Sequence, residues 1–149
     1  MRLSRKMILA LEAVVDIAYN ARPTPVQSKE ITRRQGIPQR YLEQVMQHLV
    51  HEGILRGVRG PRGGYRLATE RRRLTAGDVV RTVAALEASE EQALESRSDL
   101  AETVIRPLID GINESVMVRL DAITIEELCR KADEAGVENA ARTSMDFTI

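Results

Sequence analysis

Residues 35–68 read QGIPQRYLEQVMQHLVHEGILRGVRGPRGGYRLA, and most of the architecture can be predicted from this stretch. It opens with the turn Gln-Gly-Ile-Pro between two short helices. Ser28 is a good N-cap for the first helix, and Gly36 is a good residue just past its end. Pro38 lies near the start of the second helix, which Gly53 closes. Two short helices joined in this way form a helix-turn-helix.

The second helix, which runs to about Glu52, is amphipathic. At about 100° per residue its apolar side chains fall on one face, which we expect to pack in the core. These are Leu42, Val45, Met46 and Leu49. The opposite face is polar, with Arg40, Gln44, Gln47 and His51 at its centre and Glu43 and His48 beside it. Such a face suits a DNA groove, although a solvated helix would show the same pattern.

A β-hairpin is predicted directly after this helix. Residues 54–59 and 65–68 have the pattern of short strands, and Gly60-Pro61-Arg62-Gly63-Gly64 has that of a turn. A hairpin that follows a helix-turn-helix is a wing. Arg59 and Arg62 would project from its tip, where a DNA groove would lie, and residues 71–73 add three arginines beyond it.

The chain before this stretch begins with one helix. Met7, Leu11, Val14, Val15 and Ala18 recur at helical spacing and predict its buried face. We expect Arg5, Glu12, Asp16 and Asn20 to face solvent. The prolines at positions 23 and 25 end this helix.

The second half is predicted to be helical. Thr75 caps a helix, a long helix begins near Asp99, and Thr124 caps a last helix that Gly136 ends. Pro107 should kink the long helix or tighten its first turns. That helix carries an apolar stripe too long for a lone helix, which we expect to be covered by a second copy. The stripe comprises Leu100, Val104, Leu108, Ile112, Val116, Leu120 and Ile123.

The predicted fold class is therefore mostly α with a small β-hairpin: a winged helix-turn-helix plus a long C-terminal dimerisation helix. The DNA-binding domain would span residues 1–87, the dimerisation helices 88–136, and a poorly ordered tail 137–149.

Charge is divided unevenly along the 149 residues. Residues 1–75 carry 15 Lys and Arg against 6 Asp and Glu, whereas residues 76–149 carry 7 against 16. The net charge of the whole chain is zero, so the halves differ in sign. The basic first half fits a polyanion such as DNA, and an internally complementary dimer is the alternative.

Composition excludes several classes of protein. The single cysteine, Cys129, excludes an intrachain disulfide framework. No uncharged apolar stretch approaches twenty residues, and no cleavage site follows the apolar N-terminus, so we expect a soluble cytoplasmic protein without a membrane partner. No nucleophile elbow or phosphate-binding loop is present, so we expect no enzymatic activity.

Several blocks resemble one family closely. They are Gln35-Gly36-Ile37-Pro38, Tyr41-Leu42-Glu43-Gln44, Glu52-Gly53-Ile54-Leu55, Val58-Arg59-Gly60-Pro61 and Gly63-Gly64-Tyr65-Arg66-Leu67-Ala68. The resemblance is to the bacterial winged-helix regulators that include IscR, NsrR, RirA and CymR, and it covers residues 1 to about 87. It implies a homodimeric transcription factor that binds double-stranded DNA at partly palindromic promoter sites, and we take repression as its mode.

The resemblance also implies which residues contact DNA. Tyr41, Glu43 and Gln44 match the recognition-helix contacts, and Arg59, Gly60 and Pro61 match the wing. Arg40 stands where better-known members have a small hydroxyl residue. The side chains themselves suit these roles, because Gln can pair with adenine and Glu can accept from cytosine, while arginine favours narrow minor grooves. Ser28 and Lys29, at a helix start, are placed to hold a phosphate.

One departure concerns the cofactor. Many members bind an iron–sulfur cluster through three cysteines between the fourth helix and the dimer helix, but residues 86–99 contain neither cysteine nor histidine. We therefore expect no cofactor and no metal, and we expect residues 86–96 to be largely helical. The signal would be a small molecule or a partner protein.

Other features have a functional and a bland interpretation. Cys129 could be a redox switch or a small core residue. His48 and His51 could bind a metal or serve only as polar residues. The acidic residues Glu87, Glu90, Glu91 and Glu95 could hold a cation or form a solvated face. A winged-helix module that binds protein instead of DNA remains the alternative function.

Overall fold

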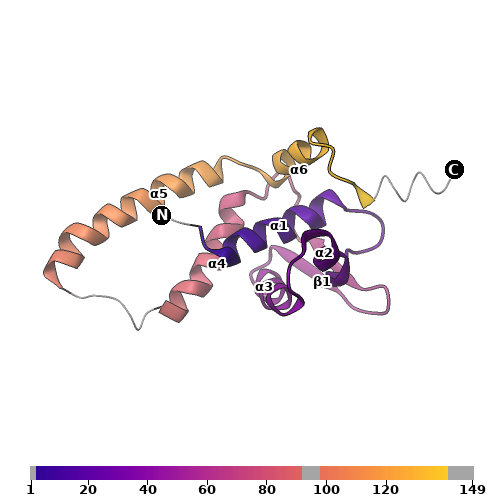
Figure 1. The fold of residues 1–149 in the computed structure, drawn as a ribbon, viewed down its shortest axis with the longest axis horizontal. Coiled ribbons are helices and arrows are strands. Elements are labelled where there is room, and N and C mark those ends of the chain that lie inside the picture. The colour runs from indigo at the N-terminus through magenta and orange to yellow at the C-terminus, as the bar shows by residue number, and fades with distance from the viewer. Residues whose placement is uncertain (1–2, 92–97, 141–149) are drawn as a thin grey trace.

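The computed structural model describes residues 3–91 and 98–140 (Figure 1). Six α-helices, one π-helical turn and a two-stranded hairpin follow one another among them. In order they are α1 (Arg5–Tyr19), α2 (Ser28–Gln35), α3 (Gln39–His51), β1 (Leu55–Val58), β2 (Gly64–Leu67), α4 (Ala76–Glu91), η2 (Ala101–Ile105), α5 (Arg106–Asp121) and α6 (Ile125–Glu134). The predicted fold class, mostly α with a small hairpin, is confirmed.

Helix α1 is the centre of the core. Figure 1 shows it running between α6 and the helix-turn-helix, and it packs against α2, α3, α4, α6 and β2. Ala10, Ala13 and Val14 are fully buried on it. The small alanines let neighbouring helices approach closely, and α4 adds Val79, Val80 and Val83 to the same core. This core is aliphatic, as the scarcity of aromatic residues requires.

The expectation that Asp16 and Asn20 face solvent is wrong. Both are buried, at 3% and 2% exposure. The Asp16 carboxylate accepts hydrogen bonds from Arg34 Nε at 2.9 Å, from Arg34 Nη2 at 2.6 Å and from Gln35 Nε2 at 2.7 Å. Burial is tolerated because the carboxylate is hydrogen-bonded and its charge is paired. Hydrophobic periodicity does not detect a polar side chain whose partners lie on another helix.

Helix α2 starts at Ser28, as predicted, but its N-cap is Gln27 and not Ser28. The Glu30 carboxylate accepts from the Gln27 backbone N–H at 2.9 Å and from Arg22 Nη2 at 2.7 Å. Burial alone would raise the pKa of Glu30, but these hydrogen bonds and the charges of Arg22 and Arg34 outweigh it and lower that pKa. The end of α2 is as predicted, with Gly36 in the left-handed conformation at φ 65°.

Helix α4 covers the first part of the segment 86–96, which the sequence predicts to be largely helical. Thr75 caps it, accepting from Asp78 N–H at 3.0 Å. It continues to Glu91, so the prediction of a helix continuous with Thr75 is confirmed as far as that residue, and 92–96 lie outside the described residues. The proposed domain boundary at residue 87 falls inside this helix.

The long helix departs from the prediction near Pro107. Instead of tightening, the backbone widens into the π-turn η2, in which the Arg106 N–H donates to the Ala101 carbonyl. Proline has no N–H to continue the α-helical ladder, and a π-turn restores the pairing just before it.

The first residues of the C-terminal segment are ordered against α1, contrary to expectation. The Tyr19 hydroxyl donates to the Val137 carbonyl at 2.6 Å, and Asn139 Nδ2 donates to the Tyr19 carbonyl at 2.9 Å. The Ala140 N–H donates to Asn20 Oδ1 at 2.9 Å. Residues 141–149 lie outside the described part of the chain. None of the helices in the described ranges is long and apolar enough to cross a membrane.

Replacing Asp16 with alanine should destabilise the fold. The change leaves the Arg34 and Gln35 donors without their buried acceptor, and we expect a loss of about 2–4 kcal/mol in the free energy of unfolding. Urea denaturation followed by circular dichroism, at one fixed protein concentration, measures this loss. The control is Glu12→Ala on the exposed side of the same helix, with an effect within about 0.5 kcal/mol. Equal effects of the two changes would contradict the role given to Asp16.

Candidate nucleic-acid interface

Helix α3 presents the predicted polar face to solvent. Leu42, Val45, Met46 and Leu49 are buried beneath it, as predicted. On the outside, Arg40, Tyr41, Glu43, Gln44 and Gln47 line one shallow hollow. Because the apolar side fixes the rotation of the helix, these five side chains point away from the core together. Four of them, all except Gln47, are the residues predicted to contact DNA from this helix.

Gln39 positions this face and was missed in the sequence. Its Oε1 accepts from Thr32 Oγ1 at 2.9 Å, while its Nε2 donates to Glu43 Oε1 at 3.0 Å and to Ser28 Oγ at 3.3 Å. One amide therefore links the start of α2, the middle of α2 and the first turn of α3. No spacing pattern marks such a residue, since its partners come from two helices.

The predicted wing forms as an antiparallel hairpin in which Leu55 pairs with Leu67 and Val58 with Gly64. Its tip residues Arg59, Gly60, Pro61 and Arg62 are exposed. The first three line one hollow together with Ser28 and Lys29 from the start of α2. The fold thus brings the predicted phosphate-binding residues and the predicted wing residues to one surface; Arg62 lies outside that hollow.

The wing is fastened to the chain before α2. Val26 and Tyr65 exchange backbone hydrogen bonds of 3.0 and 2.8 Å, so Val26 forms an isolated antiparallel β-bridge with β2. At Gly64 an added Cβ would lie 2.4 Å from the Val26 carbonyl oxygen, so a side chain there would separate the two. Arg66 also donates to the carbonyls of Arg22 and Pro23. Sequence analysis identified none of these contacts.

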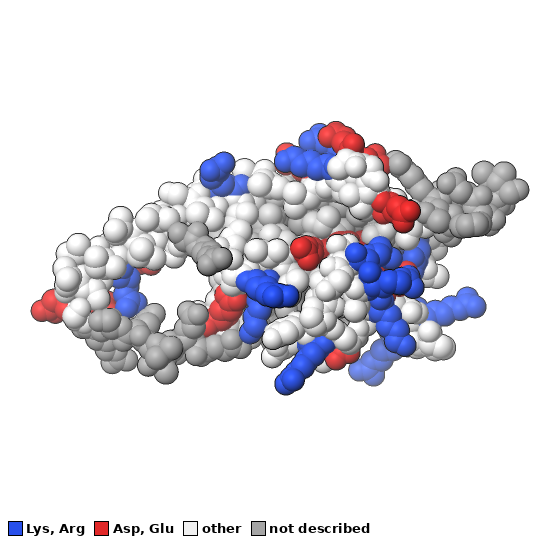
Figure 2. All heavy atoms as spheres, viewed as in Figure 1, with Lys and Arg blue, Asp and Glu red and all other residues white. Residues whose placement is uncertain are grey.

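The cations of this surface are unpaired among the described residues. Arg22 and Arg34 are held in ion pairs with Glu30 and Asp16, and residues 71–73 pair with Glu70 and Glu126. Within residues 3–91 and 98–140 no such partner is present for the exposed Lys29, Arg33, Arg40, Arg56, Arg59 and Arg62. Figure 2 shows Lys and Arg gathered over α2, α3 and the wing. Their charge is available for an anionic ligand.

The two histidines lie in different surroundings. His48 is half-buried, and its Nε2 lies 3.1 Å from the Thr82 carbonyl oxygen on α4, so it faces α4 and not the outer face of α3. His51 is exposed. Among the described residues no group of three potential ligands is close enough to hold a metal ion. Of the acidic cluster, only the Glu87 side chain lies among those described.

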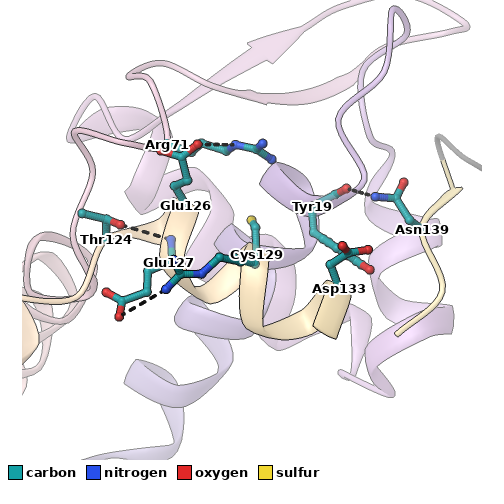
Figure 3. A pocket seen from close by; sticks show the side chains of 9 residues that line it. Tyr19, Arg71, Thr124, Glu126, Glu127, Cys129, Asp133 and Asn139 are labelled. Carbon is teal, nitrogen blue, oxygen red and sulfur yellow. Dashed lines mark hydrogen bonds and ion pairs between the residues drawn. The ribbon is translucent and has the colours of Figure 1, made fainter. Parts of the chain in front are cut away.

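Cys129 lies at the bottom of a hollow formed by α6, residue 71 and the end of α1 (Figure 3). It is 4% exposed, and burial raises the pKa of its thiol despite the nearby charge of Arg71. The reactive form of cysteine is the thiolate, so this environment favours an inert core residue over a redox switch.

The predicted dimerisation residues divide into two groups. Leu100, Val104, Leu108 and Ile112 are exposed, at 64%, 54%, 57% and 41%. Val116, Leu120 and Ile123 are half-buried, and Leu120 packs against the core of its own chain. Ile105 and Ile109, each 46% exposed, join the first group and were missed, although they share a helical face with Leu108 and Ile112 at ordinary spacing.

Comparison with known proteins gives consistent matches. A family model described as "Rrf2: Iron-dependent Transcriptional regulator" matches residues 3–131. IscR from Vibrio atlanticus is 32% identical to this chain, and the match covers 100% of this chain and 86% of that IscR. IscR from Pectobacterium atrosepticum is 33% identical, and the match covers 96% of this chain and 88% of that IscR. Both are described as HTH-type transcriptional regulators.

Solved structures agree. The structure of T. potens IscR superimposes with a TM-score of 0.72 at 30% identity and covers 93% of each chain. The structure of CymR, the global cysteine regulator of B. subtilis, superimposes with a TM-score of 0.68 at 27% identity. The match covers 88% of this chain and 98% of the CymR chain. These relatives are regulators, a class of proteins that are generally not enzymes. With its winged helix-turn-helix and a family match over most of its length, the chain belongs to the Rrf2 family of DNA-binding transcriptional regulators.

Proposed function

We propose that this protein is a homodimeric repressor that binds a partly palindromic promoter site and works without an iron–sulfur cluster. The observation that supports DNA recognition most directly is the surface shared by α3, the start of α2 and the wing. Its cations are unpaired within the described chain, whereas the arginines beside it are neutralised by carboxylates. A surface that is kept free of internal ion pairs suits phosphate contacts.

Each part of this surface has its own role in the proposal. Glu43 and Gln44 on α3 read base edges in the major groove, flanked by Arg40 and Tyr41. Arg59, Gly60, Pro61 and Arg62 enter the adjacent minor groove. Ser28 and Lys29 hold a phosphate of the DNA backbone that lies between these two grooves. The Gln39 bond to Glu43 restrains the Glu43 rotamer before DNA arrives, which lowers the entropy lost on binding.

Changes to helix and wing should affect binding differently. Gln44→Ala should weaken binding by about 1–3 kcal/mol and relax preference at one base position in each half-site. Arg59→Ala should weaken binding most on sites with narrow A·T-rich minor grooves and reduce the salt slope by about one. Gel retardation of promoter fragments at several salt concentrations measures both. Glu114→Gln, on the exposed part of α5, is the control, and unchanged affinity in both test variants would exclude this docking mode.

A second copy of the chain is proposed to cover α5. Six large apolar side chains are exposed together between residues 100 and 112, and soluble proteins rarely leave such a patch uncovered. Figure 1 shows this segment extending away from the core. In this proposal residues 1–87 bind DNA, 88–136 include the dimer contacts, and 137–149 form the tail. Two-fold symmetry would place the two DNA surfaces on half-sites at least one helical turn apart, about 34–36 Å.

A charge on this face should separate the subunits. We expect Ile112→Asp to give monomers in light scattering at micromolar concentration and to weaken operator binding, because the carboxylate would be buried between apolar side chains. Val118→Asp is the matched control: Val118 is 64% exposed on the same helix but on the opposite side. Both variants should keep wild-type helicity. A wild-type protein that is already monomeric would refute the dimer.

The residues present do not fit an iron–sulfur cluster. The chain has one cysteine, which is buried on α6, and cluster ligation takes several thiolates. The α4 helix continues to residue 91, into the region where the resemblance places the cluster cysteines of other members. Here the backbone is held by helical hydrogen bonds instead of by metal ligands.

The purified protein should therefore bind its operator without iron. After anaerobic purification we expect a colourless solution with no visible absorption, and unchanged retardation of the promoter fragment in the presence of an iron chelator. In a reconstituted transcription reaction the same protein should lower the transcript. A brown protein that contains iron and sulfide would overturn the cofactor proposal, and a rise in transcript would overturn repression.

A further inference from the structure

A second hollow lies behind the DNA surface, between α1, the end of α2, α6 and residues 137–138. Its volume is about 670 Å³, within the range of small-molecule sites. The aliphatic part of its wall comes from three parts of the chain. Leu11 and Val15 belong to α1, Leu128 and Ala132 to α6, and Val137 to the segment after α6.

The charges around this hollow are unbalanced. Glu12 and Glu138 line it, are exposed, and have no hydrogen bond or ion pair with any described residue. Arg34, the one cation among the described residues that line it, is already held by Asp16 at 2.6 Å and by Glu30 at 3.5 Å. Among the described lining residues an anionic ligand would thus meet two free carboxylates and no free cation. A cationic ligand would find two partners and an apolar wall for its body.

We propose that this hollow binds a small amphipathic organic cation, an amine or quaternary ammonium with an apolar body, and that this ligand is an effector that weakens DNA binding. The regulatory half of this inference rests on the proposed function, whereas the binding half does not. The ring of Tyr19, which also lines the hollow, adds a face on which a cation is favoured.

The position of the hollow explains how occupancy would reach the DNA surface. Its floor includes Asp16, Arg34 and Gln35, the contact that fixes the end of α2 against α1. A positive charge placed there repels the Arg34 guanidinium, which is partly exposed, and so weakens its ion pair with the enclosed Asp16 carboxylate. Because the end of α2 sets the turn into α3, loosening this contact shifts the helix-turn-helix away from its DNA-binding geometry.

The segment after α6 closes the other side of the hollow. Figure 3 shows Asn139 bound to the Tyr19 carbonyl, and Tyr19 in turn holds the Val137 carbonyl. Val137 and Glu138 are therefore kept at the rim by bonds to α1. A ligand between Glu12 and Glu138 would contact both this segment and the helix that carries Asp16.

Calorimetric titration of the full-length protein without DNA tests the binding half. The probes are 4-phenylbutylamine, the neutral 4-phenylbutan-1-ol and the anionic 4-phenylbutanoate. We expect saturable binding of the amine with a Kd on the order of 1 mM or tighter, and much weaker binding of the other two. The double variant Glu12→Gln, Glu138→Gln should weaken amine binding on the order of tenfold, while Glu114→Gln leaves it unchanged.

Operator binding in the presence of the amine tests the coupling. Saturating amine should weaken binding of the wild-type protein by about fivefold or more and leave the double variant unaffected, and operator DNA should weaken amine binding by the same factor. Failure of the unliganded protein to bind DNA would refute the proposed function and leave the calorimetric result standing.

Three results would overturn the inference about the hollow. They are equal binding of amine and carboxylate, an unchanged amine Kd in the double variant, and no saturable binding of any probe. A double variant that alters the oligomeric state but not amine binding would make the hollow an interface between copies instead.

Discussion

The position of the recognition helix depends on one buried carboxylate. Asp16 is fully enclosed and binds two successive residues, Arg34 and Gln35, at the end of α2. A guanidinium and an amide that share one carboxylate fix both the distance and the rotation between α1 and α2. The turn at Gly36 follows at once, so the direction in which α3 leaves is set by this contact. In a core made only of aliphatic side chains, packing alone would specify that orientation less uniquely.

The candidate DNA surface is assembled from that starting point by a few polar links. Gln39 connects α3 back to α2, and the Val26–Tyr65 pairing places the hairpin beside the start of α2. Gly64 permits the pairing because its Cα approaches the Val26 carbonyl closely. In these contacts the inward-facing polar groups are hydrogen-bonded to one another, whereas the outward-facing cations have no ion-pair partner among the described residues. The division between structural and available charge is thus a property of the fold, not of composition.

The second half of the chain combines two tasks. Helix α6 contributes Ile125 and Cys129 to the core of the first half, and α4 packs along α1. Between them, η2 and α5 carry apolar side chains that this chain does not cover. Ile105, Leu108, Ile109 and Ile112 follow one another at helical spacing and so form one apolar face.

Local sequence determined the helices, the hairpin and the polar face of α3, because each depends on residues a few positions apart. Helical spacing selects Leu42, Val45, Met46 and Leu49 as buried, and glycines and prolines mark the ends of elements within one turn. The tertiary structure alone decided the roles of Asp16, Asn20, Gln39 and Arg66. Their partners lie up to 120 residues away, and burying a polar group is favourable only once those partners are in place. Hydrophobic periodicity assigns such residues to the surface, since it describes a side chain's own polarity and not the groups that the fold brings to it.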